Sequence, residues 1–202
     1  MTIDLPFHRS WFDDNEINEV IETLKSGWLT TGPRTKRFED DFKQYIGCDY
    51  AIGLNSCTAG LHLALATKRF APGDEVITTT MTFPATANVI MHERLCPVLV
   101  DVEPETLTID VSQIREKITS RTKAIIPVHF AGHPCDMDPI MDLAQKHKLL
   151  IVEDAAHALE TKYKGRKIGS LGNPTAFSFY ANKNITTGEG GMLTTNDESL
   201  DE

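Results

Sequence analysis

The sequence predicts an α/β protein with a mostly parallel sheet of about seven strands and helices on both faces. Two observations support this fold class. Short apolar runs of strand length alternate with helical patterns through residues 50–154, as in strand–helix–strand units. The last two runs are joined by only about ten residues, too few for a parallel crossover, so the final strand is expected to be antiparallel.

Two helical patterns precede this alternation. Residues 13–26 open on acidic capping residues, repeat apolar residues on one face and end at Gly27. Residues 34–47 form a second such pattern, which ends at Gly47. We therefore expect an N-terminal helical segment at residues 1–48 and a large domain at residues 49–202.

The alternating region supplies the remaining elements. The expected strands are 50–54, 75–80, 97–102, 123–130, 149–154, 175–180 and 191–195. The helical patterns between them are 58–69, 84–93, 111–118 and 137–147. In open α/β sheets, ligands bind outside the carboxyl ends of the strands, so the residues that follow each strand are the first candidates for chemistry.

Composition excludes several classes of function. The 202 residues carry a net charge of −9, which argues against a nucleic-acid surface. No apolar stretch is long enough to cross a membrane, and the N-terminal residues do not have the pattern of a signal peptide. The four cysteines include no Cys-x-x-Cys pair, so we expect reduced thiols in a cytoplasmic protein.

The first expected strand leads into a candidate anion site. It ends at Asn55-Ser56, and a helix beginning near Cys57 and Thr58 follows. Free N–H groups at a helix N-terminus suit a phosphate, although simple capping is the better explanation of these residues taken alone. The sequence has neither a P-loop nor a dinucleotide-binding glycine fingerprint, which argues against a nicotinamide oxidoreductase.

Three further strand ends carry residues with chemical potential. Phe83 follows the second strand and could stack on a planar ring, or pack in the core. Asp154 ends the fifth strand, with His157 close behind; a buried carboxylate needs a partner such as a protonated heterocyclic nitrogen, but Asp154 could also cap a helix. Lys183 follows the sixth strand, where desolvation would make its amine a Schiff-base nucleophile, although most loop lysines are solvated.

One cluster could be taken for a metal site. It consists of His129, His133, Cys135 and Asp136. Its order and spacing match no zinc pattern, so we expect no metal there. The candidates at the strand ends are more informative, because a phosphate cradle, a ring-stacking aromatic, a carboxylate and an amine are together what pyridoxal 5'-phosphate (PLP) requires.

Several segments, in order, resemble the DegT/DnrJ/EryC1/StrS family of sugar aminotransferases. The matching segments are SGWLTTGP, RFEDDF, NSCTAGLHLAL, GDEVITTTMTFPATAN, IIPVHFAGHPCDMD, IVEDAAHA and FSFYANKNITTGEGG. The resemblance implies the large domain of a PLP-transferase of fold type I. Relatives are about twice as long, as two-domain enzymes would be, so a small C-terminal domain is expected to be absent.

The resemblance also implies roles for individual residues. Lys183 would bind the PLP aldehyde and transfer the proton, and Asp154 would hold the pyridine nitrogen protonated. Phe83 and His157 would lie against the ring. Cys57, Thr58 and Ser178 would bind the phosphate, although relatives often have Gly-Thr where this chain has Cys57-Thr58.

The implied reaction is amino transfer, with glutamate as the expected donor and a nucleotide-linked keto-hexose as the acceptor. Its product would be an amino sugar for polysaccharide, lipopolysaccharide or glycoside biosynthesis. A homodimer with shared active sites is expected. Two alternatives remain: an inert large-domain fragment, or a family sugar dehydratase, which would carry His in place of Lys183.

Overall fold

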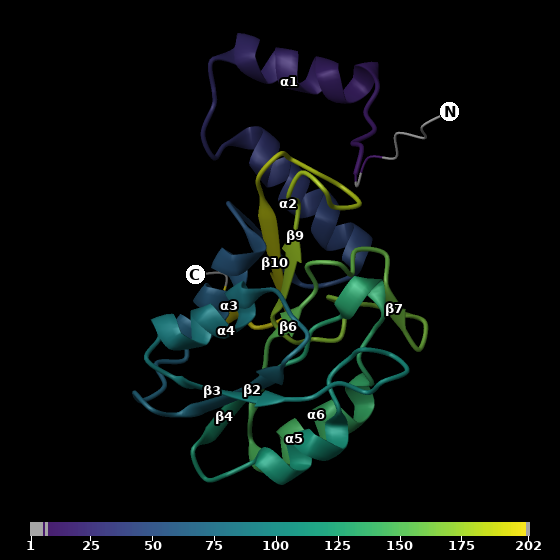
Figure 1. The fold of residues 1–202 in the computed structure, drawn as a ribbon. Helices are drawn as coiled ribbons and strands as arrows, with labels where there is room; N and C mark the ends of the chain where they lie inside the picture. Colours follow the sequence, from purple (N-terminus) through teal and green to yellow (C-terminus); the bar gives the residue numbers. More distant parts are fainter. Residues whose placement is uncertain (1–5, 7, 201–202) are drawn as a thin grey trace, which may run out of the picture.

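The computed structural model describes residues 6 and 8–200, in which two four-stranded sheets meet to form one layer and a two-stranded hairpin forms a separate sheet (Figure 1). The outer ends of the two expected segments, at residues 1–5, 7 and 201–202, lie outside the described residues. One half of the layer has the order β1 (Tyr50–Leu54), β10 (Gly191–Thr195), β9 (Thr175–Ser178) and β6 (Glu153–Asp154). The other half has the order β3 (Cys96–Val100), β2 (Glu75–Thr79), β4 (Thr122–Ile126) and β5 (Leu150–Ile151).

The two halves join at Val152, where the chain changes its hydrogen-bonding partner. The Val152 N–H donates to the Ile125 carbonyl at 3.0 Å, whereas the Glu153 N–H donates to the Pro174 carbonyl at 2.8 Å. A parallel bridge between Val128 and Asp154 closes the junction. The strand that carries Asp154 therefore lies in the middle of the layer.

The predicted count of about seven strands is wrong, since the described residues form ten. The change of partner at Val152 divides the single expected run into β5 and β6. An unpredicted hairpin adds β7 (Lys162–Tyr163) and β8 (Arg166–Lys167), which are too short and polar to give an apolar run. The seven expected runs all contain strands, and the antiparallel final strand is confirmed, because β10 pairs antiparallel with both β1 and β9.

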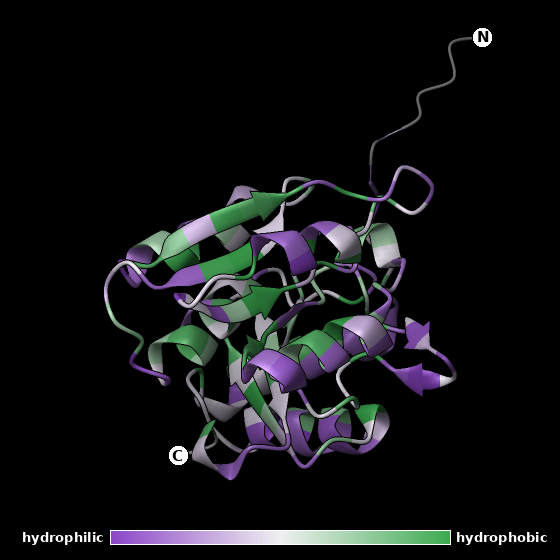
Figure 2. Ribbon diagram, turned by 90° about the horizontal axis from the view of Figure 1, so that it is seen from below, coloured by the Kyte–Doolittle hydropathy of each residue, from purple (hydrophilic) through white to green (hydrophobic). Residues whose placement is uncertain are grey.

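Helices cover both faces of the layer (Figure 1). One apolar core unites one face with α2 (Pro33–Ile46), α5 (Val111–Lys117) and α6 (Met137–His147). The other core lies under α3 (Cys57–Ala66) and α4 (Pro84–His92). Successive residues of β2 enter opposite cores, because successive side chains of a strand point to opposite faces. Ile77 enters the first core and Val76 the second. Figure 2 shows apolar residues gathered along the strands, while the helices carry many polar residues.

The first helix, α1 (Asp14–Ser26), forms where the sequence predicts it but buries none of its residues. Asp13 and Glu16 form a capping box, and Gly27 ends the helix in the left-handed conformation, with φ 71°. Its apolar face remains exposed, including Val20 at 60% and Leu24 at 61%. By contrast, α2 contributes Phe42 to the core, where its ring contacts Phe177.

No helix among the described residues is long and apolar enough to cross a membrane. Two short 3-10 turns, Phe130–Gly132 and Glu198–Leu200, complete the regular structure of the described chain.

Candidate functional site

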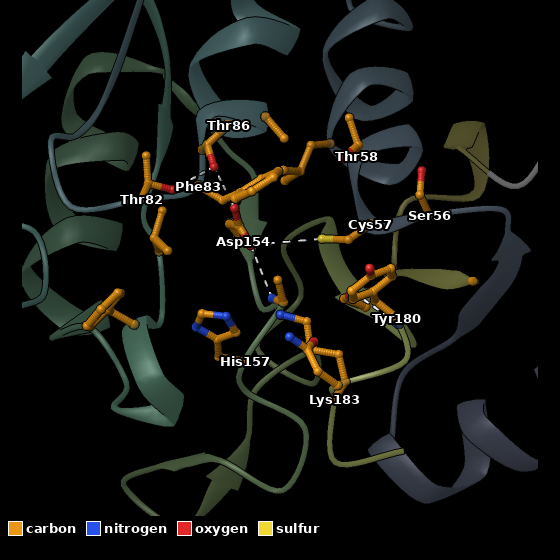
Figure 3. Close-up of a pocket in the computed structure, with 18 of the residues that line it drawn as sticks. Ser56, Cys57, Thr58, Thr82, Phe83, Thr86, Asp154, His157, Tyr180 and Lys183 are labelled. Carbon is orange, nitrogen blue, oxygen red and sulfur yellow. Dashed lines mark hydrogen bonds between the residues drawn. The ribbon is translucent and has the colours of Figure 1, made fainter. Parts of the chain in front are cut away.

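A cavity of about 720 Å³ opens at the carboxyl ends of several strands (Figure 3). The residues that line it come from the starts of α3 and α4, the end of β6 and the loop after β9. All seven of the predicted site residues line this cavity: Cys57, Thr58, Phe83, Asp154, His157, Ser178 and Lys183. The fold thus brings together residues that are up to 126 positions apart in the sequence.

One end of the cavity is formed by the N-terminus of α3. Ser56 is the N-cap, and its Oγ accepts a hydrogen bond from the Ala59 N–H at 3.2 Å. The N–H groups of Cys57 and Thr58 precede the first intrahelical bond and make no hydrogen bond with other described residues. These two N–H groups, with the partial positive charge of the helix end, can bind an anion such as a phosphate.

Cys57 contributes its backbone N–H to this anion site, while its side chain packs in the apolar core under α3. The thiol is buried and donates to the Ala176 carbonyl at 3.3 Å. Burial, together with the nearby Asp154 carboxylate, raises the pKa of this thiol well above its usual value. Cys57 is therefore a protonated, packed thiol and is poorly suited to act as a nucleophile.

The Asp154 carboxylate lies at the floor of the cavity, with a residue exposure of only 5%. Its Oδ1 accepts from the Ala156 N–H at 3.1 Å, and its Oδ2 accepts from the Thr86 hydroxyl at 2.8 Å. The Cys57 sulfur is 3.9 Å from Oδ1, a long contact that adds little. Over the described part of the chain no cation forms an ion pair with Asp154, so this buried carboxylate can bind a positively charged ligand group.

Lys183 and His157 face Asp154 across the cavity (Figure 3). Partial burial lowers the pKa of the Lys183 ammonium, although Cys57 and Asp154 oppose this shift, so more of the nucleophilic neutral amine is present at a given pH. Burial and the positive charge of Lys183 lower the pKa of His157. The His157 Nδ1 accepts from the Ala131 N–H at 3.3 Å, which leaves Nε2 to carry the proton of the neutral ring.

The loop that carries Lys183 is held to the end of β9. The Lys183 N–H donates to the Tyr180 carbonyl at 2.9 Å, and the Thr187 N–H donates to the Phe179 carbonyl at 3.0 Å. Gly188, with φ 82°, takes the left-handed conformation that the return to β10 needs. These bonds anchor the base of the loop, so the lysine is held at the cavity.

Phe83 lines the cavity and is not a core residue. It is the N-cap of α4, and 75% of its surface is exposed. The alternative of core packing is therefore wrong, and the ring is available to a ligand in the cavity. Ser178, the last residue of β9, lines the same cavity.

The cluster that could be taken for a metal site has other hydrogen-bonding partners. His129 is fully buried; its Nε2 is 2.9 Å from Glu153 Oε2, and its Nδ1 accepts from the Cys135 N–H at 3.1 Å. Asp136 accepts a hydrogen bond from the Tyr163 hydroxyl at 2.5 Å. Over residues 6 and 8–200, no group of three or more His, Cys, Asp or Glu residues could hold a metal ion.

Comparison with known proteins identifies the family of this chain. The model of the DegT/DnrJ/EryC1/StrS aminotransferase family matches residues 11–202. The chain belongs to this family. Among curated relatives, the spore coat polysaccharide biosynthesis protein SpsC of Bacillus subtilis is 54% identical over 196 residues, which are 97% of this chain and 50% of SpsC. The chain spans about half the length of the curated relatives it matches.

Solved family structures share the fold. The aminotransferase from Psychrobacter cryohalolentis is 41% identical with a TM-score of 0.91, covering 96% of this chain and 50% of the other. Spr1654 of Streptococcus pneumoniae, solved in its PLP form, is 39% identical with a TM-score of 0.93 over 98% of this chain and 54% of the other. The α/β architecture of this chain is therefore that of the family.

Several residues that line the cavity are not among those predicted from the sequence. Thr82 and Thr86 flank Phe83, and Thr86 contacts Asp154 directly. Tyr180 and Glu189 belong to the segments on either side of Lys183 and also line the cavity. The available signal was position alone, because each of these residues lies within about six positions of a predicted site residue at a strand end.

Close packing at the anion end predicts the effect of one substitution. A Cβ at Gly191 would lie 2.3 Å from the Ser56 carbonyl carbon and 2.5 Å from the Cys57 nitrogen. Both contacts are backbone atoms, so Gly191→Ala must displace the start of α3. We expect a loss of about 1–3 kcal/mol in the free energy of unfolding, measured by urea denaturation.

Gly53→Ala is the matched control for this substitution. Gly53 lies in the neighbouring strand β1, and its Cβ would meet the side-chain atoms Thr35 Cγ2 at 3.2 Å and Glu39 Oε1 at 3.3 Å. Because side-chain ends can move aside, the loss should be smaller. Equal losses in the two variants would contradict the steric explanation.

Proposed function

We propose that this chain is the cofactor-binding part of a PLP-dependent aminotransferase that acts on sugars. The observation that carries the proposal is the arrangement of Lys183, Asp154 and the α3 N-terminus around one cavity. An amine, a carboxylate and an anion site in one cavity match the aldehyde, the pyridine nitrogen and the phosphate of PLP. The cavity volume of about 720 Å³ is within the range of small-molecule sites.

When bound, PLP supplies an electron-accepting ring, and the protein supplies binding, orientation and proton transfer. Asp154 would hold a proton on the ring nitrogen, since a buried carboxylate favours a cation beside it. Lys183 would bind the aldehyde carbon through its Nζ and then carry a proton to and from the substrate carbon. Cys57, Thr58 and Ser178 would hold the phosphate, while Phe83 and His157 would fix the plane of the ring.

The finer parts of the proposal concern substrates and partners. We propose glutamate as the amino donor and a nucleotide-linked keto-hexose as the acceptor, giving an amino sugar for polysaccharide, lipopolysaccharide or glycoside biosynthesis in the cytoplasm. SpsC, named for spore coat polysaccharide biosynthesis, supports a polysaccharide product. We also propose that residues 49–202 form the PLP-binding unit and that the full-length protein is a homodimer. Exposure of Phe83 and Tyr180 beside the cavity is compatible with cover from a second subunit.

Two alternative functions compete with this one. A sugar dehydratase of the same family would carry His at position 183, so Lys183 favours amino transfer. An inert fragment is the second alternative, because the chain spans about half of its curated relatives. Turnover distinguishes an active chain from an inert one.

The test is a two-step amino transfer with the purified chain. After incubation with PLP, glutamate should convert the bound cofactor to pyridoxamine phosphate, seen as loss of visible absorbance. A panel of nucleotide-linked keto-hexoses, added next, should restore the absorbance with one member and give an amino sugar by mass spectrometry. Omission of glutamate is the control. Binding of PLP without either conversion would support the inert-fragment alternative.

A further inference from the structure

The Asp154 carboxylate has a hydrogen-bonding partner, Thr86, to which the proposed reaction assigns no role. The Thr86 hydroxyl lies 2.8 Å from Asp154 Oδ2, although the two residues are 68 positions apart. Thr86 itself is fully buried. A second hydroxyl, that of Thr82, lies 2.7 Å from the Thr86 oxygen. The three side chains therefore form a chain of hydrogen bonds that ends on Asp154 (Figure 3).

The direction of the protons in this chain follows from the carboxylate. An ionised carboxylate can only accept hydrogen bonds, so the Thr86 hydroxyl must donate to Asp154. Because a hydroxyl has a single proton, the Thr86 oxygen must then accept a hydrogen bond from the Thr82 hydroxyl. With the Ala156 N–H on Oδ1, each oxygen of Asp154 has one donor from the protein.

Thr86 lies in the first turn of α4, and its hydroxyl makes its hydrogen bonds outside the helix. It contacts the side chain of Thr82, in the loop before α4, and the side chain of Asp154 on the distant strand β6. The first turn of α4 makes this possible: Pro84 begins the helix, and the Thr86 N–H donates to the Phe83 carbonyl at 3.1 Å. The start of α4 therefore carries both Phe83 and the hydroxyl that reaches Asp154.

We propose that Thr86 is a positioning residue, which orients the Asp154 carboxylate toward the ring nitrogen of the cofactor. The proposal rests on the proposed function, because it assigns Asp154 to that nitrogen. Loss of the hydroxyl would remove a charge-assisted hydrogen bond and leave Oδ2 without its donor in a buried site. The carboxylate could then turn away, and the protonated form of the ring nitrogen would be less stabilised.

The variant that tests this role is Thr86→Val, which keeps the shape of the side chain and removes the hydroxyl. Wild type and variant are loaded with PLP labelled with ¹⁵N in the ring, and the ¹⁵N chemical shift reports whether the nitrogen is protonated. We expect the wild-type shift to be that of a pyridinium and the Thr86→Val shift to move toward neutral pyridine. The affinity for PLP should fall by about tenfold. Thr86→Ser keeps the hydroxyl and should restore both values.

Thr78→Val is the matched control for the loss of a buried threonine hydroxyl. Thr78 is fully buried in β2, and its hydroxyl donates to the Ile126 carbonyl at 2.8 Å, within the sheet and outside the cavity lining. This variant should lose stability but retain the wild-type ¹⁵N shift. A shift change of equal size in Thr78→Val would show a general effect of destabilisation and would overturn the positioning role.

The other outcomes are equally decisive. An unchanged ¹⁵N shift and PLP affinity in Thr86→Val overturn the role of Thr86. If Thr86→Val does not fold, Thr86→Ala is measured in its place, and an unchanged shift there overturns the role equally. If the wild-type chain gives no bound ¹⁵N signal, the proposed function fails instead, so the two failures are distinguishable.

Discussion

Lys183→Ala should abolish covalent attachment of PLP and reduce glutamate-dependent conversion of the cofactor by about 10³-fold or more. Removal of a positioned acid–base group alone costs about 10²–10⁴-fold in rate, and Lys183 would also provide the bond to the cofactor. The side chain is partly buried, and its lowered pKa increases the fraction of neutral amine. The variant should still bind PLP non-covalently, because the α3 N-terminus and Asp154 are unchanged.

Borohydride reduction followed by peptide mass spectrometry measures the attachment. The wild-type adduct should lie on Lys183, and the Lys183→Ala sample should contain no adduct above the level of surface labelling. Lys146→Ala is the control, since Lys146 is an exposed residue of α6. A wild-type adduct on another lysine, or an unchanged visible spectrum in Lys183→Ala, would show that this assignment is wrong.

Asp154→Asn should reduce the conversion of bound PLP by about 10²–10⁴-fold while the cofactor stays bound. Breaking a buried ion pair by removing one partner costs about 3–5 kcal/mol, and each 1.4 kcal/mol corresponds to a factor of ten. The substitution keeps the shape of the side chain but removes the charge that would hold the ring nitrogen protonated. The amide oxygen can still accept from the Ala156 N–H, but the NH2 group that replaces Oδ2 cannot accept the hydrogen bond from Thr86.

Single-turnover absorbance after mixing with glutamate gives the rate, and a PLP titration gives the affinity. Asp142→Asn, at an exposed position of α6, is the matched control for loss of one negative charge. If Asp154→Asn reacts at the wild-type rate, Asp154 does not stabilise the protonated ring. A parallel collapse of PLP affinity and folding stability would assign Asp154 a structural role instead.

The sequence predicts those residues of the candidate site that lie at or just after the ends of the strands. Asp154 and Lys183 each follow an apolar run, and the rule that ligands bind beyond the carboxyl ends of strands selects them without contact information. For Thr86 this rule gives only a position near Phe83, and it does not reveal the contact with Asp154. The importance of Thr86 comes from a 2.8 Å contact with a residue 68 positions later, and a threonine in the sequence TFPATAN has no pattern that reveals such a contact.

The amino-acid sequence by itself determined the local elements of this protein, because periodicity, capping residues and glycines act over a few residues. It determined the alternation of strands and helices and the antiparallel direction of the last strand, whose link to β9 is short. Only the tertiary structure decided which strands are neighbours. It placed β10 between β1 and β9, and at Val152 it moved the backbone hydrogen bonds of the chain from one neighbouring strand to another. These choices brought Cys57 and Lys183 to one cavity. Those choices depend on packing and hydrogen bonds between distant segments, which no local pattern encodes.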